Sequence, residues 1–150
     1  PSEDLGQLPA DNYDLITLWH VLEHVHDLHG YLDMLSRLLK PGGYLLLAVP
    51  NYTSFDASHY GEYWAAYDVP RHLFHFSPDA MRALLKIHRL RLENVLPMKF
   101  DSYYVSLLSE KYRTGRQSLL RATRTGFRSN QKAARETERY SSLIYVVRPE

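Results

Sequence analysis

Apolar residues along this chain form two short runs, and each run is followed by residues that can do chemistry or contact a ligand. The first run, Leu15–Trp19, is too short for a helix core and rich in branched residues, so it predicts a buried strand. Asp27 can cap the helix that follows, because leucines recur on one side of it through about Leu39. The second run, Tyr44–Val49, comes after Pro41-Gly42-Gly43 and predicts another strand. Strand, helix, glycine turn and strand form a parallel βαβ unit, whose ligands gather where the strands end.

The rest of the chain continues to alternate helices and strands. Asn51–Phe76 is a long, aromatic and histidine-rich connection, and loops of this length are often functional lids or binding segments. Ser77-Pro78-Asp79 has the N-cap, proline and first-turn acid that begin a helix. The remaining predicted elements are that helix to about His88, a strand over Arg91–Met98, a helix from Asp101 or Ser102 to about Tyr112, and a closing strand over Leu143–Val147.

Length and composition are those of one soluble domain. The chain has 150 residues, and no stretch approaches the roughly 20 apolar residues that span a bilayer. No basic-then-apolar secretory leader opens it. The absence of cysteine removes disulfides and thiolate ligands and favours a cytoplasmic location.

The net charge of +1 hides a strong asymmetry between the two ends of the sequence. Residues 1–110 hold 8 Lys or Arg against 14 Asp or Glu, whereas residues 111–150 hold 10 against 3. Lys111–Arg135 contains 8 basic residues and no acid, which is typical of a solvated or mobile segment and sometimes of a phosphate-binding one. A nucleic-acid-binding module would interleave aromatic residues with these cations, but only Tyr112 and Phe127 lie there, so nucleic acid is disfavoured as a partner.

His20-Val21-Leu22-Glu23-His24 matches H-x-x-E-H, the inverted zinc-protease pattern. That chemistry needs both histidines on one helical face as zinc ligands. Here His20 directly follows the strand-like run and has no helical lead-in. Zinc-protease chemistry is therefore disfavoured, and we assign no metal ligand.

Four short motifs carry a family resemblance: Tyr13-Asp14-Leu15-Ile16, Leu22-Glu23-His24-Val25, Leu39-Lys40-Pro41-Gly42-Gly43 and Val69-Pro70-Arg71-His72. With them the chain resembles the C-terminal half of a class I S-adenosylmethionine-dependent methyltransferase, of the group that includes ubiquinone-biosynthesis O-methyltransferases. The resemblance implies an α/β fold, a partial Rossmann-like sheet made of strands four to seven with the last antiparallel and helices beside it. In the family the sheet order is three-two-one-four-five-seven-six. The fourth strand would then lie at an open edge, through which the chain could self-associate.

The cofactor turn of such enzymes has no counterpart in this sequence. Family members hold S-adenosylmethionine on a Gly-rich turn after their first strand, but none of the 7 glycines here is spaced as G-x-G. We therefore expect residues 1–150 to be the C-terminal part of a methyltransferase domain, without its first strands and inactive alone. A non-catalytic remnant that serves as an interaction domain is the alternative.

The resemblance also implies where the cofactor lies. Trp19 and His20 follow the fourth strand, at the edge where this fold meets S-adenosylmethionine, and we include Leu18 and His24 with them. A buried core Trp is the alternative for Trp19. Some ubiquinone O-methyltransferases carry E-x-x-E-H at this place and bind a divalent ion, but His20 stands where their first Glu would be. Glu23 and His24 could instead orient a short helix.

The acceptor, a small molecule, is expected at the long connection. Methyl transfer needs a deprotonatable nucleophile, close approach and exclusion of water. His72, our catalytic candidate, could take a proton from a hydroxyl acceptor, since a histidine pKa lies near neutrality. Arg71 could pair with an acid or phosphate. Alternatively Arg71 pairs with Asp68, and the histidines cap the next helix. The substrate-binding candidates are Asn51, Trp64, Arg71 and His75.

Overall fold

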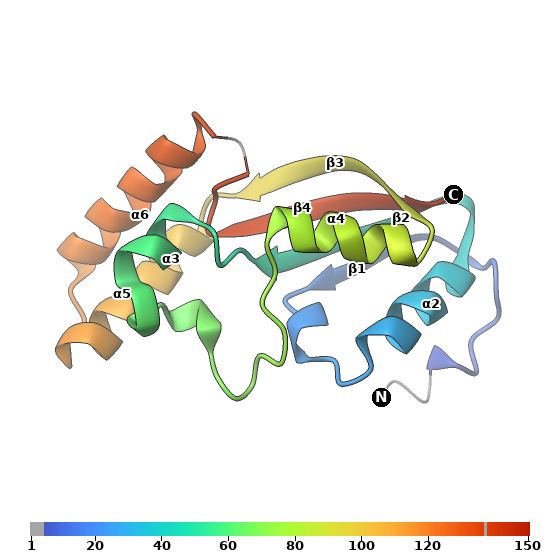
Figure 1. Cartoon of the computed structure of the whole chain (residues 1–150), viewed down its shortest axis with the longest axis horizontal. Helices are drawn as coiled ribbons and strands as arrows, with labels where there is room; N and C mark the ends of the chain where they lie inside the picture. Colours follow the sequence, from blue (N-terminus) through green and yellow to red (C-terminus); the bar gives the residue numbers. More distant parts are fainter. Residues whose placement is uncertain (1–4, 137) are drawn as a thin grey trace.

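The computed structural model describes residues 5–136 and 138–150, which build one four-stranded sheet with helices around it (Figure 1). The strands lie in the order β1-β2-β4-β3. They are β1 (Tyr13–Trp19), parallel to β2 (Leu39–Pro50), and β4 (Ser142–Pro149), antiparallel to both β2 and β3 (Leu90–Met98). This confirms the order four-five-seven-six expected for the second half of the family sheet, including its antiparallel strand.

Helices α2 (Leu28–Leu38) and α4 (Pro78–Ile87) pack against one face of the sheet (Figure 1). Both begin at the predicted caps, because Asp27 accepts from Gly30 N at 2.9 Å and Ser77 accepts from Ala80 N at 3.1 Å. Their apolar stripes meet alternate residues of the two central strands. The main core is formed chiefly by Leu28, Leu32, Leu35, Leu45, Leu47, Val49, Met81, Leu85, Leu143, Tyr145 and Val147.

The glycine turn predicted between α2 and β2 lies inside the strand instead. Pairing jumps from Tyr13↔Leu39 to Leu15↔Tyr44, so the intervening residues bulge out of the ladder. A Cβ on Gly43 would lie 3.0 Å from the carbonyl oxygen of Tyr13, and this close backbone approach requires glycine.

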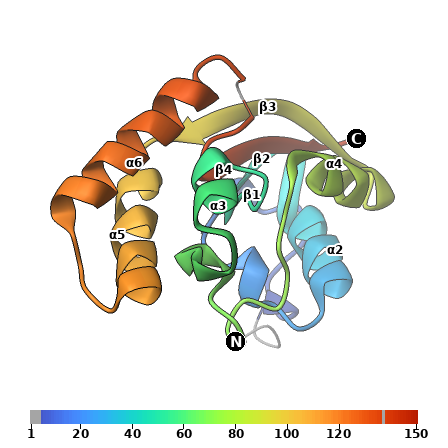
Figure 2. The same cartoon turned by 60° about the vertical axis from the view of Figure 1, so that its left-hand side comes forward.

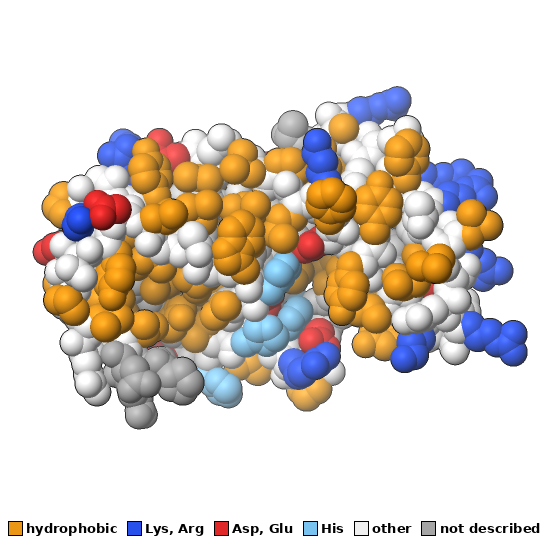
Figure 3. Space-filling model, turned by 180° about the vertical axis from the view of Figure 1, so that it is seen from behind, with side chains coloured by type: hydrophobic (Ala, Val, Ile, Leu, Met, Phe, Trp, Pro, Cys, Tyr) orange, Lys and Arg blue, Asp and Glu red, His pale blue; other side chains and the backbone are white. Residues whose placement is uncertain are grey.

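The opposite face of the sheet keeps apolar side chains exposed (Figure 3). Leu15 and Trp19 are 53% and 50% exposed, and only Leu18 of that run is buried. The prediction of a fully buried strand is therefore wrong. The reason is positional: β1 is the outermost strand of the described sheet, and α2 and α4 both cover the other face.

The long connection after β2 is folded rather than irregular. It contains α3 (Phe55–Tyr60) and two short 3-10 turns, Gly61–Tyr63 and Ala65–Tyr67. Tyr60 and Trp64 are buried there in a second apolar cluster that also includes Val105. The aromatic density of this segment therefore serves packing to a large extent.

Two antiparallel helices, α5 (Asp101–Thr114) and α6 (Leu119–Ala133), follow β3 and precede β4 in the sequence. They lie together beside the sheet (Figure 2). Of the two alternatives for the basic segment, the structure supports the solvated one for α6, because Arg121, Arg124 and Arg128 are exposed. The segment is nevertheless an ordered helix, which Ser118 caps and which packs along α5. Small residues allow the close approach: a Cβ added to Gly126 would lie 2.8 Å from the Tyr103 ring.

Candidate functional site

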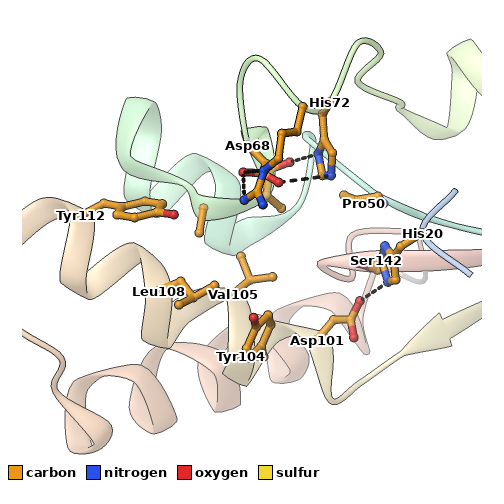
Figure 4. A pocket seen from close by; sticks show the side chains of 13 residues that line it. His20, Pro50, Asp68, His72, Asp101, Tyr104, Val105, Leu108, Tyr112 and Ser142 are labelled. Atoms are coloured by element: carbon orange, nitrogen blue, oxygen red, sulfur yellow. Dashed lines mark hydrogen bonds and ion pairs between the residues drawn. The ribbon is translucent and has the colours of Figure 1, made fainter. Parts of the chain in front are cut away.

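An open cavity of about 270 Å³ lies at the carboxyl ends of β1 and β2, between the connection after β2 and helix α5 (Figure 4). Its position is the one at which open α/β sheets bind ligands. Apolar and aromatic side chains make most of the wall, and a few charged groups converge on it. The lining residues are His20, Pro50, Ala65, Ala66, Asp68, Arg71, His72, Asp101, Tyr104, Val105, Leu108, Tyr112 and Ser142.

His20 joins β1 to α5 across one wall of this cavity. It follows the last residue of β1 with a left-handed φ of 53°, which turns its ring toward two carboxylates. Nδ1 lies 3.2 Å from Glu23 Oε1, and Nε2 lies 3.0 Å from Asp101 Oδ2. Because both ring nitrogens face acceptors, both carry hydrogen and the ring is an imidazolium. The hydrogen bonds to Asp101 and then to Glu23 raise the pKa of His20 to about 9.

The carboxylates that hold His20 differ in their exposure. Glu23 is completely buried, and no described group hydrogen-bonds its Oε2. Asp101 stands at the first turn of α5, where the positive end of the helix also favours a carboxylate. Burial is the largest single influence and acts to raise the pKa of Asp101, but the hydrogen bond from His20, the nearby Ser142 hydroxyl and the charge of His20 together outweigh it, so the pKa is lowered from 3.8.

His72 presents a free ring nitrogen at the cavity. Its Nδ1 lies 2.8 Å from the carbonyl oxygen of Ala66, so Nδ1 carries the hydrogen of the neutral ring. Nε2 lies 3.9 Å from both Glu23 Oε1 and Asp68 Oδ2, beyond hydrogen-bond distance. Burial lowers the pKa of His72 below 6.5. The ring is therefore neutral at physiological pH, with Nε2 able to accept a proton.

Arg71 lies at the mouth of the cavity and pairs with Asp68, as one of the two sequence alternatives had it. Its Nη2 and Nε donate to Asp68 Oδ1 at 2.6 and 3.1 Å, and the side chain is 74% exposed. The same alternative also expected the histidines to cap the next helix, and this is wrong, because Ser77 caps α4. His75 instead contacts the carbonyl oxygen of Tyr67 at 2.9 Å, outside the cavity.

Two further substrate candidates lie beneath the cavity rather than on its wall. Asn51 is buried, and its Nδ2 donates to the carbonyl oxygens of Glu138 and Tyr140. Trp64 is also buried, and its indole donates to Asp56 Oδ2 at 2.9 Å. Both side chains are occupied in holding the connection after β2 in place. A polar or aromatic residue at this place in the sequence does not reveal whether it faces a ligand or the core.

The cofactor candidates gather around the end of β1. Leu18 is buried in the main core, whereas Trp19 keeps half of its surface, so the alternative of a core tryptophan is wrong. His24 lies behind His72, with ring centroids 4.6 Å apart, and its Nδ1 contacts the carbonyl oxygen of Arg71 at 3.0 Å. Of this set His20 reaches the cavity wall.

Ligand atoms of Glu23, His24 and His72 all lie within 4.8 Å of one another, so these residues could hold a divalent ion. His20 is outside the group, because its ring is committed to two carboxylates. Leu22–His24 is a single 3-10 turn, which does not present His20 and His24 as a helical zinc-ligand pair. The geometry thus removes the inverted zinc-protease arrangement.

Sequence analysis did not identify the α5 side of the cavity. Tyr104, Val105, Leu108 and Tyr112 line it at intervals of one helical turn, and Asp101 adds the carboxylate. The helical spacing was visible in the sequence, but its direction toward the end of β1 depends on contacts between distant segments.

Comparison with known proteins places the chain among methyltransferases. Residues 2–94 match the family described as "Methyltransferase domain". A ubiquinone biosynthesis O-methyltransferase of Xanthomonas oryzae is 33% identical over 107 residues, which cover 67% of this chain and 45% of that protein. The chain thus spans about half the length of the curated relatives it matches.

Solved structures show the same fold at low sequence identity. A methyltransferase of Thermotoga maritima, described as SAM-dependent and a possible histamine N-methyltransferase, superposes with a TM-score of 0.63 at 15% identity over 96% of this chain and 59% of its own. The cyclase SpnF gives 0.58 at 13% identity over 95% of this chain and 52% of its own. Its different chemistry shows that the fold alone does not define the reaction.

Proposed function

Because the chain belongs to the methyltransferase domain family, we propose that its protein transfers a methyl group from S-adenosylmethionine to a small-molecule acceptor bound in the cavity between β2 and α5. The observation that carries this proposal is the neutral His72 ring, which directs a free Nε2 to a largely apolar cavity at the carboxyl ends of the parallel strands.

S-adenosylmethionine would supply the methyl group, carried on a sulfonium. We assign the contacts of this chain with it to the end of β1, where Trp19 is exposed and His20 fixes the turn that follows. Leu18 supports that turn from the core, and His24 lies next to it.

His72 acts on the acceptor. The proton of an acceptor hydroxyl would pass to His72 Nε2, whose Nδ1–H stays hydrogen-bonded to the carbonyl oxygen of Ala66. The imidazolium that forms is stabilised by the carboxylates of Glu23 and Asp68, each 3.9 Å away. Tyr104 and Tyr112 on α5 would hold a flat acceptor in place. An oxygen acceptor is the choice that a base at this position favours.

The test measures transfer of labelled methyl groups by the full-length protein to a panel of hydroxyl, amine and carbon acceptors. We expect His72→Gln to lower turnover about 100-fold with nearly unchanged cofactor affinity, since general-base catalysis contributes on this scale. The matched control is His75→Gln, because His75 is outside the cavity. Absence of transfer to every acceptor class would refute the function, and a loss of only a few-fold would leave His72 a packing residue.

The 150-residue chain by itself should bind S-adenosylmethionine weakly and give no transfer in the same assay, because it has no G-x-G turn. The alternatives raised by the sequence, a non-catalytic remnant and a nucleic-acid-binding module, are not favoured by the family match.

A further inference from the structure

Helix α6 carries a concentration of positive charge at one end of the molecule (Figure 3). The segment 111–135 has 8 basic residues and no acid. Arg113 is partly neutralised by the buried Glu110, whose Oε1 is 2.7 Å away. Arg124 and Arg128 lie on the solvent side of the helix and are exposed. This end of the protein is therefore suited to an anionic partner.

Large apolar side chains lie beside these cations and point into solvent. Leu119, Leu120 and Phe127 are 72%, 83% and 52% exposed. Leu120 and Phe127 lie about 20° apart around the helix at 3.6 residues per turn. Phe100, 87% exposed, continues the row, because Asn130 donates to the carbonyl oxygen of the adjacent Lys99 at 2.8 Å. We call these four side chains the apolar stripe.

The stripe has no part in holding α6 to the protein. Contact with α5 is made by small residues on the other side of the helix, namely Ala122, Thr125, Gly126 and Ser129. Polar residues at the stripe would leave this packing unchanged, and they would avoid exposing apolar surface to water. Packing among the described residues therefore does not account for the stripe, which suits contact with a partner.

We propose that α6 and the adjacent start of α5 dock this protein on an anionic lipid surface. A helix that divides its exposed surface into an apolar strip and a basic strip lies in the plane of a membrane interface. The apolar stripe would enter the headgroup region, while Arg124, Arg128 and Lys99 would meet lipid phosphates. None of the described helices has the length and apolar character of a membrane span.

The alternative partner, nucleic acid, fits the stripe less well. Single-stranded nucleic acid is bound by aromatic side chains that stack on bases between the cations. Leu119 and Leu120 cannot stack, and they are among the most exposed apolar side chains of α6. Apolar aliphatic groups next to arginine match an acyl-chain boundary better than a nucleotide backbone.

The test is co-sedimentation of the full-length protein with vesicles made of equal parts phosphatidylglycerol and phosphatidylcholine, compared with pure phosphatidylcholine. Binding is expected to the anionic vesicles, with at least about 10-fold weaker binding to neutral ones. The double variant Leu120→Ser with Phe127→Ser should weaken anionic binding by about 10-fold or more. Arg124→Gln with Arg128→Gln should also weaken it and reduce its salt dependence.

Two matched controls separate this surface from the rest of the molecule. Leu96→Ser removes an apolar side chain that is 40% exposed on the uncovered face of the sheet, and Lys86→Gln removes an exposed cation of α4. Both should bind vesicles as the unaltered protein does, and circular dichroism should show every variant folded.

Three outcomes overturn the proposal. One is no binding to anionic vesicles, and another is an equal loss in Leu96→Ser, which would assign binding to the sheet face. The third is tight binding of a DNA or RNA oligonucleotide that the arginine pair abolishes and the Leu120/Phe127 pair leaves unchanged. None of these measurements depends on methyl transfer.

Discussion

Replacement of Asp101 with Asn should remove the ion pair that fixes α5 to the end of β1. His20 Nε2 and Asp101 Oδ2 are 3.0 Å apart, and the second ring nitrogen remains bound to Glu23 at 3.2 Å. The rise of the His20 pKa from 6.5 to about 9 would amount to roughly 3 kcal/mol at about 1.4 kcal/mol per tenfold change in proton affinity. That figure covers both carboxylates, and the His20 side chain keeps 36% of its surface exposed to screening solvent. We therefore expect Asp101→Asn to lower the free energy of unfolding by about 1 kcal/mol near neutral pH.

The stabilisation that Asp101 provides should decrease as the pH rises. The folded-state pKa of His20 is above the unfolded value, so its contribution to stability is complete below about pH 6.5 and is lost as the pH rises through about 9. Urea unfolding at pH 6 and at pH 10 should thus show the difference between wild type and Asp101→Asn at the lower pH and little at the higher. NMR titration of the His20 ring should show a lowered pKa in the variant.

Asp14→Asn is the control for this experiment. Asp14 pairs with Lys40 at 2.7 Å, but its side chain is 83% exposed, so Asp14→Asn should lower the free energy of unfolding little at either pH. A cost for Asp101→Asn that is the same at pH 6 and pH 10 would refute the reasoning, because the pair would then act without the His20 proton.

The remaining predictions concern the cofactor, the helix pair and the sheet. In the full-length protein, Trp19→Ala should weaken S-adenosylmethionine binding by roughly 1–3 kcal/mol in calorimetric titration, on the scale of a lost aromatic contact; unchanged affinity would place the cofactor elsewhere. Gly126→Ala should lower the free energy of unfolding by about 1–2 kcal/mol, because the added methyl group overpacks against Tyr103 by more than alanine gains in helix propensity. Thermal melting measures this, and an equal or higher melting temperature would contradict the close packing. The isolated 150-residue chain should self-associate through the open edge and uncovered face at β1, and Leu15→Lys should reduce this in light scattering; a monomer at high concentration would argue against it.

Elements with strong local signals could be predicted from the sequence. The caps at Asp27 and Ser77 are read from the residues that follow them, and both caps form. Helix α6 has an N-cap at Ser118 but no apolar periodicity, since its buried side is made of Ala122, Thr125, Gly126 and Ser129. A helix held by small residues is defined by the surface it approaches, and that surface is distant in sequence.

Contacts between segments distant in sequence also limited the prediction of the cavity residues. His72 was a good candidate because its position in the long connection is chemically distinctive, and it does line the cavity. Trp64 was equally distinctive, yet it fills a second core that the sequence did not reveal. Asp101 had no distinctive local context beyond a possible helix cap, and its role follows from its contact with His20. Residue type indicated which groups can do chemistry, whereas tertiary contacts decide which of them meet.

The stability of the helix pair and the shape of the cavity depend on the same contacts. One side of α5 packs on α6, where Ser102 donates to the carbonyl oxygen of Gly126 at 3.3 Å. Another side lines the cavity. Next to it, the buried Ser109 hydroxyl accepts a hydrogen bond from Ala65 N at 2.8 Å and ties α5 to the connection after β2. Helix α5 is not part of the sheet. The position of the α5 side chains that line the cavity therefore depends on three contacts, which are those with His20, with Ala65 through Ser109, and with α6. Gly126→Ala, which forces the two helices apart, should therefore raise KM for the acceptor more than it changes cofactor affinity, since we propose that the cofactor is held at the end of β1.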